Sequence, residues 1–176
     1  MCGIVGYIGK NKAQGIMTSG LRRLEYRGYD SAGIATLTKG GKPTLLRVKG
    51  KVTELDSLTA EQPRSDHVGI GHTRWATHGV PSEANAHPHQ AGDIFLVHNG
   101  IIENYRELKA KLTNHDFQSE TDTEVLAALI NSFYEKNQDL LSAVSQALKL
   151  VVGTYGIAVI SAKQPAEIIV ARLGSP

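Results

Sequence analysis

The order of hydrophobic and polar positions predicts strands first, then a run of helices, then strands again. Short apolar runs bounded by turn residues predict strands over residues 3–8, 33–38, 44–49, 68–73, 94–98, 155–161 and 167–172. Apolar residues at helical spacing predict helices over residues 13–26, 101–112, 125–133 and 140–148. The third helix is preceded by Thr121-Asp122-Thr123-Glu124, which fits a capping box. Grouped strands and grouped helices favour an α+β fold of packed layers over alternating βαβ units.

Composition and charge indicate a globular domain and argue against several classes of partner. The chain has 176 residues, 41% of them hydrophobic, and a formal net charge of +2. We therefore expect one domain over residues 1–176, with no nucleic-acid or membrane partner. One cysteine cannot form an internal disulfide and no signal peptide is recognisable, so we expect a cytoplasmic location. The sequence stops directly after a predicted strand, from which we expect a fold that is incomplete at its C-terminus.

The single cysteine, Cys2, directly follows the initiator Met1. Aminopeptidases generally remove a methionine that precedes a small residue, so the mature chain is expected to begin with a thiol beside a free α-amine. An α-amine has a pKa of about 7.7–8.0, against about 10.4 for lysine, so part of it is neutral at pH 7 and available as a base. The position predicts an N-terminal nucleophile activated by its own amine. The alternative is a small apolar cysteine at the start of a buried strand.

Two polar segments that follow predicted strands offer groups that bind charge. Arg74 directly follows the predicted strand over residues 68–73, and its guanidinium can pair with a carboxylate through two hydrogen bonds. The alternative is a surface arginine in a structural ion pair. Asn99 and Gly100 directly follow the predicted strand over residues 94–98. There a side-chain amide beside a backbone N–H gives two donors for an oxyanion. The alternative for this dipeptide is an ordinary turn.

Asp122 stands at the start of a predicted helix, where it can bind an ammonium group or serve only as an acid of the first turn. The 7 histidines include His87 and His89, which alternate in an extended segment and could face the same side. No carboxylate or cysteine stands beside them at ligand spacing, so we expect no metal and no other cofactor. A Cys–His dyad, with His72, His78 or His98 as base, is an alternative that needs no free N-terminus.

Together these residues resemble the glutaminase domain of the glutamine–fructose-6-phosphate aminotransferase (isomerizing) family. The resemblance covers essentially the whole chain and runs in order through residues 1–6, 22–33, 72–79, 85–89, 98–104 and 119–124. The turn Tyr26-Arg27-Gly28-Tyr29-Asp30 differs from the His-Arg-Gly-Gln-Asp and His-Arg-Gly-Pro-Asp turns of two related families, the amidophosphoribosyltransferases and the asparagine synthetases. Trp75 replaces a tyrosine usual in the amidophosphoribosyltransferases. Both differences favour the hexosamine-forming family.

The resemblance implies a role for each candidate residue of the reacting centre. It implies that Cys2 is the nucleophile, with its α-amine as base after removal of the methionine. Asn99 and the N–H of Gly100 are expected to form the oxyanion hole. Arg74 is expected to bind the α-carboxylate of L-glutamine, and Asp122 its α-ammonium group.

Four further roles and the fold follow from the same resemblance. Thr77 and His78 are expected to line the substrate pocket, Arg27 to stand in a turn that closes over the nucleophile, and Trp75 to gate the passage of ammonia. The implied fold is the four-layer αββα sandwich of N-terminal nucleophile hydrolases, which agrees with the order of elements predicted from the hydrophobic pattern.

The implied activity is hydrolysis of L-glutamine to glutamate and ammonia. In this family the ammonia converts fructose 6-phosphate to glucosamine 6-phosphate in a synthase part that the 176 residues do not contain, and the full enzyme is expected to be a homodimer. Two alternatives stay open. One is the glutaminase domain of another class II amidotransferase, such as an amidophosphoribosyltransferase, and the other is a non-catalytic glutamine-binding module if Met1 is retained.

Overall fold

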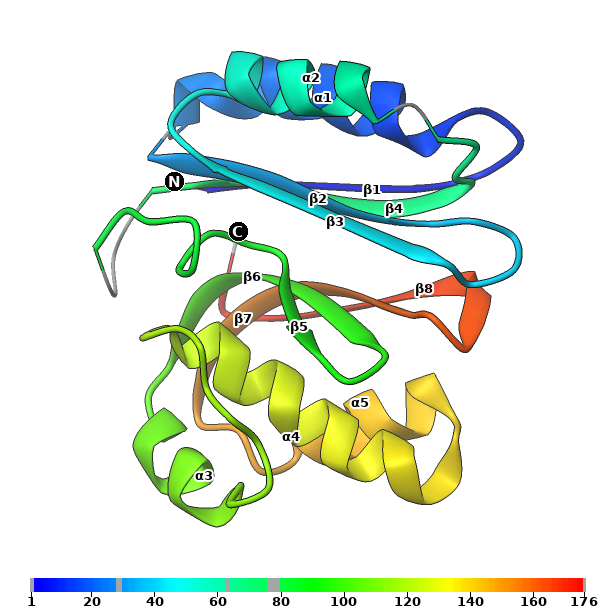
Figure 1. Cartoon of the computed structure of the whole chain (residues 1–176). Coiled ribbons are helices and arrows are strands. Elements are labelled where there is room, and N and C mark those ends of the chain that lie inside the picture. The colour runs from blue at the N-terminus through cyan, green and yellow to red at the C-terminus, as the bar shows by residue number, and fades with distance from the viewer. Residues whose placement is uncertain (1, 28–29, 63, 76–79, 176) are drawn as a thin grey trace.

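The computed structural model describes residues 2–27, 30–62, 64–75 and 80–175. These residues form two antiparallel sheets that lie face to face, each covered by helices on its outer side (Figure 1). The layers follow one another as helices, sheet, sheet and helices. This arrangement confirms the expected α+β fold and its four-layer αββα sandwich.

The first sheet carries the N-terminus of the chain. Its strands, in the order in which they pair, are β1 (Gly3–Ile8), β4 (Val68–Arg74), β2 (Ser31–Leu37) and β3 (Pro43–Lys49). Two helices cover its outer face: α1 (Ala13–Leu24), which continues into the 3₁₀ turn η1 (Glu25–Arg27), and α2 (Val52–Glu61).

The second sheet is built from the later part of the chain. Its strands, in order of pairing, are β5 (His89–Ala91), β6 (Ile94–Ile102), β7 (Gly153–Ser161) and β8 (Gln164–Leu173). The helices that cover it are α3 (Tyr105–Lys111), α4 (Asp122–Asn137) and α5 (Leu140–Leu148).

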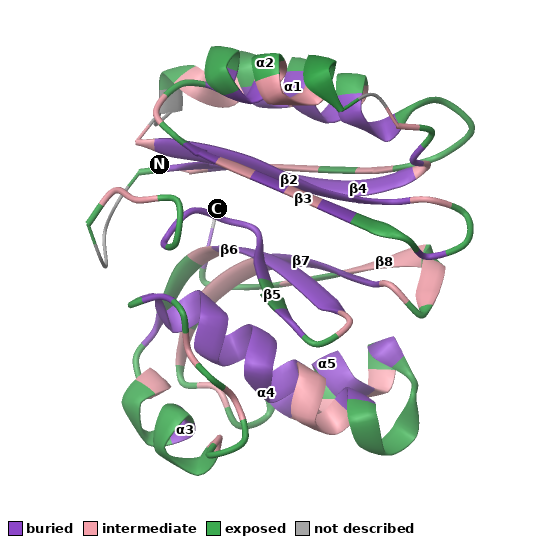
Figure 2. Ribbon diagram, in the orientation of Figure 1, coloured by how far each residue is buried: buried purple, intermediate pink, exposed green. Residues whose placement is uncertain are grey.

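The four layers arise because the inner strands are apolar on both faces. Successive side chains of a strand point to opposite faces, so neighbours can belong to different cores. In β2, Ile34 packs under the helices whereas Ala35 packs between the sheets. In β6, Leu96 packs toward α4 and α5 whereas Phe95 packs between the sheets. Figure 2 shows β2 and β4 buried along their whole length, as this double packing requires.

The end of β6 corrects the sequence-based prediction. The predicted strand over residues 94–98 continues to Ile102, so Asn99 and Gly100 lie within a strand, and the helix predicted from residue 101 begins only at Tyr105. Pairing with β7 along the whole of β6 decides this, since Gly100 lies opposite Tyr155. Gly100 has a φ of +136°, a backbone conformation that favours glycine. The Asn-Gly pair therefore does not form the ordinary turn considered as its alternative.

Helix α2 was not predicted, because its stabilising contact comes from a distant part of the chain. Lys51 precedes the helix without a side-chain cap, and the first N–H of the helix, that of Val52, donates to Glu25 Oε1 over 2.7 Å. Only Val52 and Leu55 of this helix are buried. A sequence without a cap and with two buried positions gives little helical signal.

The start of α4 confirms half of the predicted capping box. The Thr121 hydroxyl accepts the N–H of Glu124, as a capping residue does. The Glu124 carboxylate turns away from Thr121 and accepts the N–H groups of Gln118 and Ser119 at 2.9 and 2.7 Å. The acid therefore ties the preceding loop to the helix, which fixes the first turn of α4, including Asp122.

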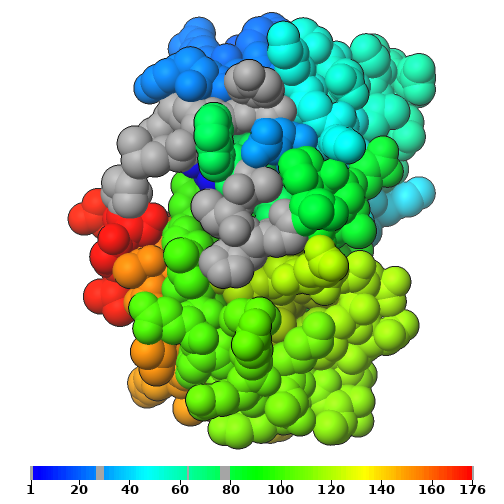
Figure 3. Space-filling model, turned by 90° about the vertical axis from the view of Figure 1, so that its left-hand side faces the viewer, coloured from blue at the N-terminus to red at the C-terminus, as the bar shows by residue number. Residues whose placement is uncertain are grey.

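Both ends of the described chain lie on the same side of the molecule, the side turned toward the viewer in Figure 3. No helix within the described ranges is long and apolar enough to cross a membrane.

Candidate active site

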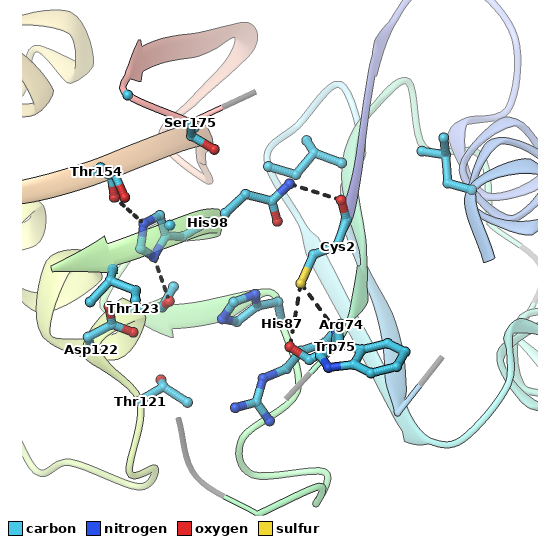
Figure 4. A pocket seen from close by; sticks show the side chains of 17 residues that line it. Cys2, Arg74, Trp75, His87, His98, Thr121, Asp122, Thr123, Thr154 and Ser175 are labelled. Atoms are coloured by element: carbon cyan, nitrogen blue, oxygen red, sulfur yellow. Dashed lines mark hydrogen bonds between the residues drawn. The ribbon is translucent and has the colours of Figure 1, made fainter. Parts of the chain in front are cut away.

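One cavity of about 500 Å³ gathers six of the candidate residues. It lies where the two sheets meet, beside the start of β1, and it is lined by Cys2, Arg74, Trp75, Asn99, Gly100 and Asp122 (Figure 4). These residues come from positions up to 120 apart in the sequence, so only folding brings them together. Its volume is in the range of small-molecule sites.

Cys2 directly precedes β1 and borders the end of β4. The register that pairs Gly3 with Thr73 puts Cys2 beside the end of β4, and the N–H of Trp75 donates to Cys2 Sγ over 3.1 Å. Gly3 lets β1 pack closely against α1 and β4, because a Cβ there would lie 2.7 Å from the Cβ of Leu24 and 2.9 Å from Thr73 Oγ1. The cysteine is only half-buried and faces the cavity. It is therefore a partly accessible thiol beside the cavity and not a buried strand residue.

Asn99 lies opposite Cys2 and reaches its main chain. Asn99 Nδ2 donates to the carbonyl oxygen of Cys2 over 3.2 Å, while Oδ1 of the same amide lies 2.7 Å from His72 Nε2. Asn99 and its neighbour Gly100 both line the cavity. At Gly100 a Cβ would lie 2.1 Å from the carbonyl oxygen of Thr154, so this close strand contact requires glycine.

Arg74 and Asp122 provide opposite charges to the cavity from the two sides of the molecule. Arg74 ends β4 and is only 4% exposed, which argues against a surface ion pair. Burial lowers the pKa of its guanidinium, and electrostatic interactions with nearby acidic groups, including Asp122 and Asp30, oppose that effect. Asp122 opens α4 and accepts the N–H of Ile102 through Oδ2 at 2.7 Å. That contact orients the carboxylate, so the residue does more than supply charge to the first turn.

Of the other four candidate residues, one lines the cavity, one lies in η1 and two are outside the described residues. Trp75 lines the cavity with its side chain partly open to solvent, since the residue is 54% exposed. Arg27 ends the 3₁₀ turn η1 and is the last residue described before residue 30. Thr77 and His78 lie outside the described residues.

Two of the three histidines considered as the base of a Cys–His dyad are engaged elsewhere. His98 lies against Thr123 Oγ1 through Nδ1 at 3.1 Å and against the carbonyl oxygen of Thr154 through Nε2 at 3.3 Å. Burial lowers its pKa, opposed by the charge of Asp122 and by the Thr154 carbonyl. His72 contacts Asn99 and His87 rather than the thiol. The third, His78, is outside the described residues.

His87 and His89 do face the same side, as their alternation predicted, but they meet a third histidine. The rings of His72 and His87 have centroids 4.3 Å apart, and those of His87 and His89 4.9 Å. His89 Nε2 also lies 2.9 Å from Thr121 Oγ1. Burial lowers the pKa of each of these histidines, to about 3 for His72 and His89. Within the described part of the chain, no group of three or more metal-ligating side chains is arranged to hold an ion.

The sequence analysis did not propose several cavity residues as site residues. Thr121 and Thr123 come from the start of α4 and Thr154 from β7, and all three line the cavity. Ile4 and Leu24 form an apolar part of its wall. Apolar periodicity along β1 and α1 predicts burial of these two residues, but no local signal shows that they face a cavity rather than a core.

A comparison with protein-family models supplies the family. The model described as "Glutamine amidotransferase domain" matches residues 56–174, well over half of the chain. The chain belongs to the glutamine amidotransferase family. It is therefore a domain of the glutamine amidotransferase type of enzyme, with the αββα fold described above.

Curated relatives of this glutamine amidotransferase domain share one name. The chain is 51% identical over 179 residues to glutamine–fructose-6-phosphate aminotransferase [isomerizing] of Pseudomonas putida, and 52% identical over 181 residues to that of Bacteroides thetaiotaomicron. Each alignment covers 100% of this chain. The chain spans 29% and 30% of the length of these two relatives.

Solved structures of other proteins have a similar fold. The chain is similar to glutamine phosphoribosylpyrophosphate (PRPP) amidotransferase from B. subtilis, with a TM-score of 0.80 and 30% identity. That match covers 98% of this chain and 37% of the other. A chain described as the allosteric regulatory enzyme of purine biosynthesis matches with a TM-score of 0.81 and 29% identity over the same shares.

Proposed function

We propose that this amidotransferase domain hydrolyses L-glutamine to glutamate and ammonia, with Cys2 as nucleophile. The observation that carries the proposal is a single cavity lined by the only thiol of the chain, two neutral hydrogen-bond donors, one guanidinium and one carboxylate. Glutamine carries the complementary groups: a side-chain amide to attack, an α-carboxylate and an α-ammonium group.

The proposed reaction begins when the α-amine of Cys2, free after loss of Met1, takes the thiol proton. The sulfur then bonds to the side-chain amide carbon of glutamine, whose carbonyl oxygen becomes an oxyanion. Asn99 Nδ2 and the N–H of Gly100 donate to this oxyanion. Donors that are already oriented stabilise the developing charge without reorganisation.

The second half of the proposed reaction releases both products. The C–N bond breaks as the protonated α-amine returns its proton to the leaving nitrogen, which departs as ammonia and leaves a thioester on Cys2. Water, deprotonated by the same amine, attacks the thioester carbonyl. The C–S bond breaks, the thiol regains its proton, and glutamate leaves. One base therefore serves both steps.

Substrate orientation is assigned to the charged residues of the cavity. Arg74 binds the α-carboxylate, because a guanidinium matches two carboxylate oxygens. Asp122 binds the α-ammonium group and is held for this by the N–H of Ile102. The proposal also keeps Thr77 and His78 as pocket residues and Arg27 in the turn over the nucleophile.

For the whole protein, we propose that ammonia passes to a synthase part that converts fructose 6-phosphate to glucosamine 6-phosphate. The names of relatives that are about half identical to this chain support the proposal. The lower identity to a PRPP amidotransferase, 30%, does not favour the amidophosphoribosyltransferase alternative. In this proposal residues 1–176 belong to the glutaminase domain, Trp75 gates ammonia, and the full enzyme is a cytoplasmic homodimer.

The proposal is tested by labelling with a glutamine analogue that carries an electrophile at the side-chain carbonyl. Labelling is expected at Cys2, the only thiol, with glutamine protecting it and ammonia release lost in proportion. Cys2→Ala is the matched control, and it should neither label nor hydrolyse glutamine. Hydrolysis by Cys2→Ala, or an unlabelled thiol in folded protein without Met1, would contradict the assignment.

A glutamine-binding module without turnover is distinguished by the N-terminus. Intact-mass measurement shows whether Met1 has been removed. Glutamine binding by a protein that has lost Met1 and yet releases no ammonia would favour the binding module over the enzyme.

A further inference from the structure

We infer that His72 is a positioning residue for the oxyanion hole: its Nε2–H holds the Asn99 amide so that the amide NH₂ faces Cys2. The inference rests on the proposed function, because it gives Asn99 the role of a donor to the reacting centre. His72 lies in β4 of one sheet and Asn99 in β6 of the other, so the contact crosses the sheet interface.

The two hydrogen bonds of the Asn99 side chain define its orientation. Nδ2 lies 3.2 Å from the carbonyl oxygen of Cys2, which can only accept, so this atom must be the donating nitrogen. The amide oxygen then lies 2.7 Å from His72 Nε2, which must therefore donate. If the amide were rotated by half a turn, its oxygen would face the Cys2 carbonyl, and two acceptors would oppose each other.

The proton on Nε2 is favoured by the other side of the His72 ring. A neutral imidazole that carries its proton on Nε2 has a lone pair on Nδ1. His87 Nδ1 lies 3.2 Å from this Nδ1, and 3.4 Å from Nε2, so a proton on His87 Nδ1 can be donated to the lone pair. The His72 ring therefore accepts one hydrogen bond from His87 and donates another to Asn99.

Burial keeps the arrangement neutral at physiological pH. His72 is 0% exposed, and burial lowers its pKa to about 3, which the hydrogen bonds to Asn99 and to the backbone of His98 oppose only in part. A charged His72 would carry protons on both nitrogens and would confront His87 with a donor in place of an acceptor. The buried histidines thus let one tautomer persist, and that tautomer fixes which end of the amide faces the cavity.

Two substitutions of His72 separate positioning from packing. His72→Leu removes the donor, and we expect kcat for glutamine hydrolysis to fall by about tenfold or more, up to the ~10²–10³-fold expected for losing an oxyanion donor itself. KM should stay within about twofold, since Arg74 and Asp122 bind the ground state. His72→Gln returns an N–H near the Nε2 position and should restore most of kcat. His67→Leu, directly before the start of the same strand and outside the cavity, is the control for loss of a histidine.

A double-mutant cycle with Asn99→Ala tests whether His72 acts through Asn99. Once the amide is gone, His72→Leu should lower kcat no further. An equal loss in both backgrounds, a folded His72→Leu protein with normal kcat, or a folded His72→Gln protein as slow as His72→Leu would overturn the inference. Normal kcat in Asn99→Ala alone would instead overturn the oxyanion role in the proposed function, and with it the reason for positioning the amide.

The wild-type protein gives a test that does not depend on the folding of variants. Nitrogen-15 NMR of the histidine rings distinguishes a protonated from an unprotonated ring nitrogen. His72 should be neutral between pH 6 and 8, with its proton on Nε2. A proton on Nδ1, or a charged ring at pH 7, would overturn the inference even if His72→Leu fails to fold.

Discussion

The two sheets contribute different chemistry to the same cavity. The first sheet supplies Cys2, just before β1, and Arg74, at the end of β4, so its groups stand at strand ends. The second supplies Asn99 and Gly100 from within β6, and Asp122 from the helix packed on it. The proposed nucleophile and the donors proposed to stabilise the oxyanion are therefore in separate layers. Such a site exists only while the two sheets stay packed against each other in this relative position.

This difference predicts that changes on the two sides will have different kinetic signatures. A change at the nucleophile removes the chemical step itself. A change in β6 leaves a reactive thiol but weakens stabilisation of the transition state, and a change at Arg74 or Asp122 weakens binding of substrate.

Blocking the N-terminus should have the largest effect, because it disables the first sheet's contribution. In a protein that retains Met1, the nitrogen of Cys2 is part of a peptide bond and cannot accept a proton near neutral pH. Loss of a general base typically lowers the rate by ~10²–10⁴-fold, and steric blockage adds to this. Ammonia release should be compared between preparations with and without Met1, each verified by intact mass. Full activity with Met1 retained would favour a Cys–His dyad, with His78 as the base still to be examined.

Asn99→Ala should disable the second sheet's contribution while leaving the thiol reactive. We expect kcat to fall by ~10²–10³-fold with little change in KM. Asn104→Ala is the matched control, because Asn104 only bridges Leu150 O and Val152 N–H near the start of α3. That variant should lose stability and keep its turnover per folded molecule. Equal behaviour of the two variants in kcat and melting temperature would mean that Asn99 is structural.

Arg74→Lys keeps the charge but loses the planar pair of donors that suits a carboxylate. We expect weaker glutamine binding by about 1–3 kcal/mol, which raises KM about 5- to 150-fold with kcat less affected. Arg47→Lys is the matched control, since Arg47 contacts the carbonyl oxygens of Ala84 and Ala86, outside the set of residues that line the cavity. An unchanged KM in Arg74→Lys would remove Arg74 from the substrate site.

Acid should weaken the interface between the sheets without affecting the site at neutral pH. Burial lowers the pKa of His72, His87 and His89, so the unfolded chain binds more protons than the folded chain below about pH 6.5. As the pH falls below about 6.5, the free energy of unfolding should decrease by up to about 1.4 kcal/mol per pH unit for each histidine, and for His72 and His89 this continues down to their folded pKa of about 3. Urea denaturation between pH 7.5 and 4.5 measures this slope. His89→Gln should reduce this slope by the contribution of one histidine. An unchanged slope would contradict the conclusion that His89 is buried in its neutral form.

Local pattern predicted most of the fold. The strand over residues 3–8 and the helix over residues 140–148 have the predicted bounds, because the buried side of each follows a simple period. Prediction failed where distant contacts decide the structure. Helix α2 depends on Glu25 for its first hydrogen bond, and β6 extends to Ile102 because β7 pairs with its whole length.

The site was predictable in its residue types and not in its geometry. The sequence indicated Cys2, Arg74, Asn99 and Asp122 through motifs, and the structure brings all four to one cavity. It could not indicate His72 as the partner of Asn99, since the two residues are 27 positions apart and lie on different sheets. Hydrogen-bond partners across an interface follow from packing, which no local pattern records.

The sequence by itself determined the element types, the family-like motifs and the presence of one thiol directly after Met1, because each depends on neighbouring residues or on composition. Tertiary structure alone decided that Asn-Gly would be a strand and not a turn, and that Arg74 would be buried and not exposed. It also decided which way the Asn99 amide points. The physical reason is that strand pairing and burial are set by residues far away in the chain, and their contacts outweigh the weak local preference of any single dipeptide.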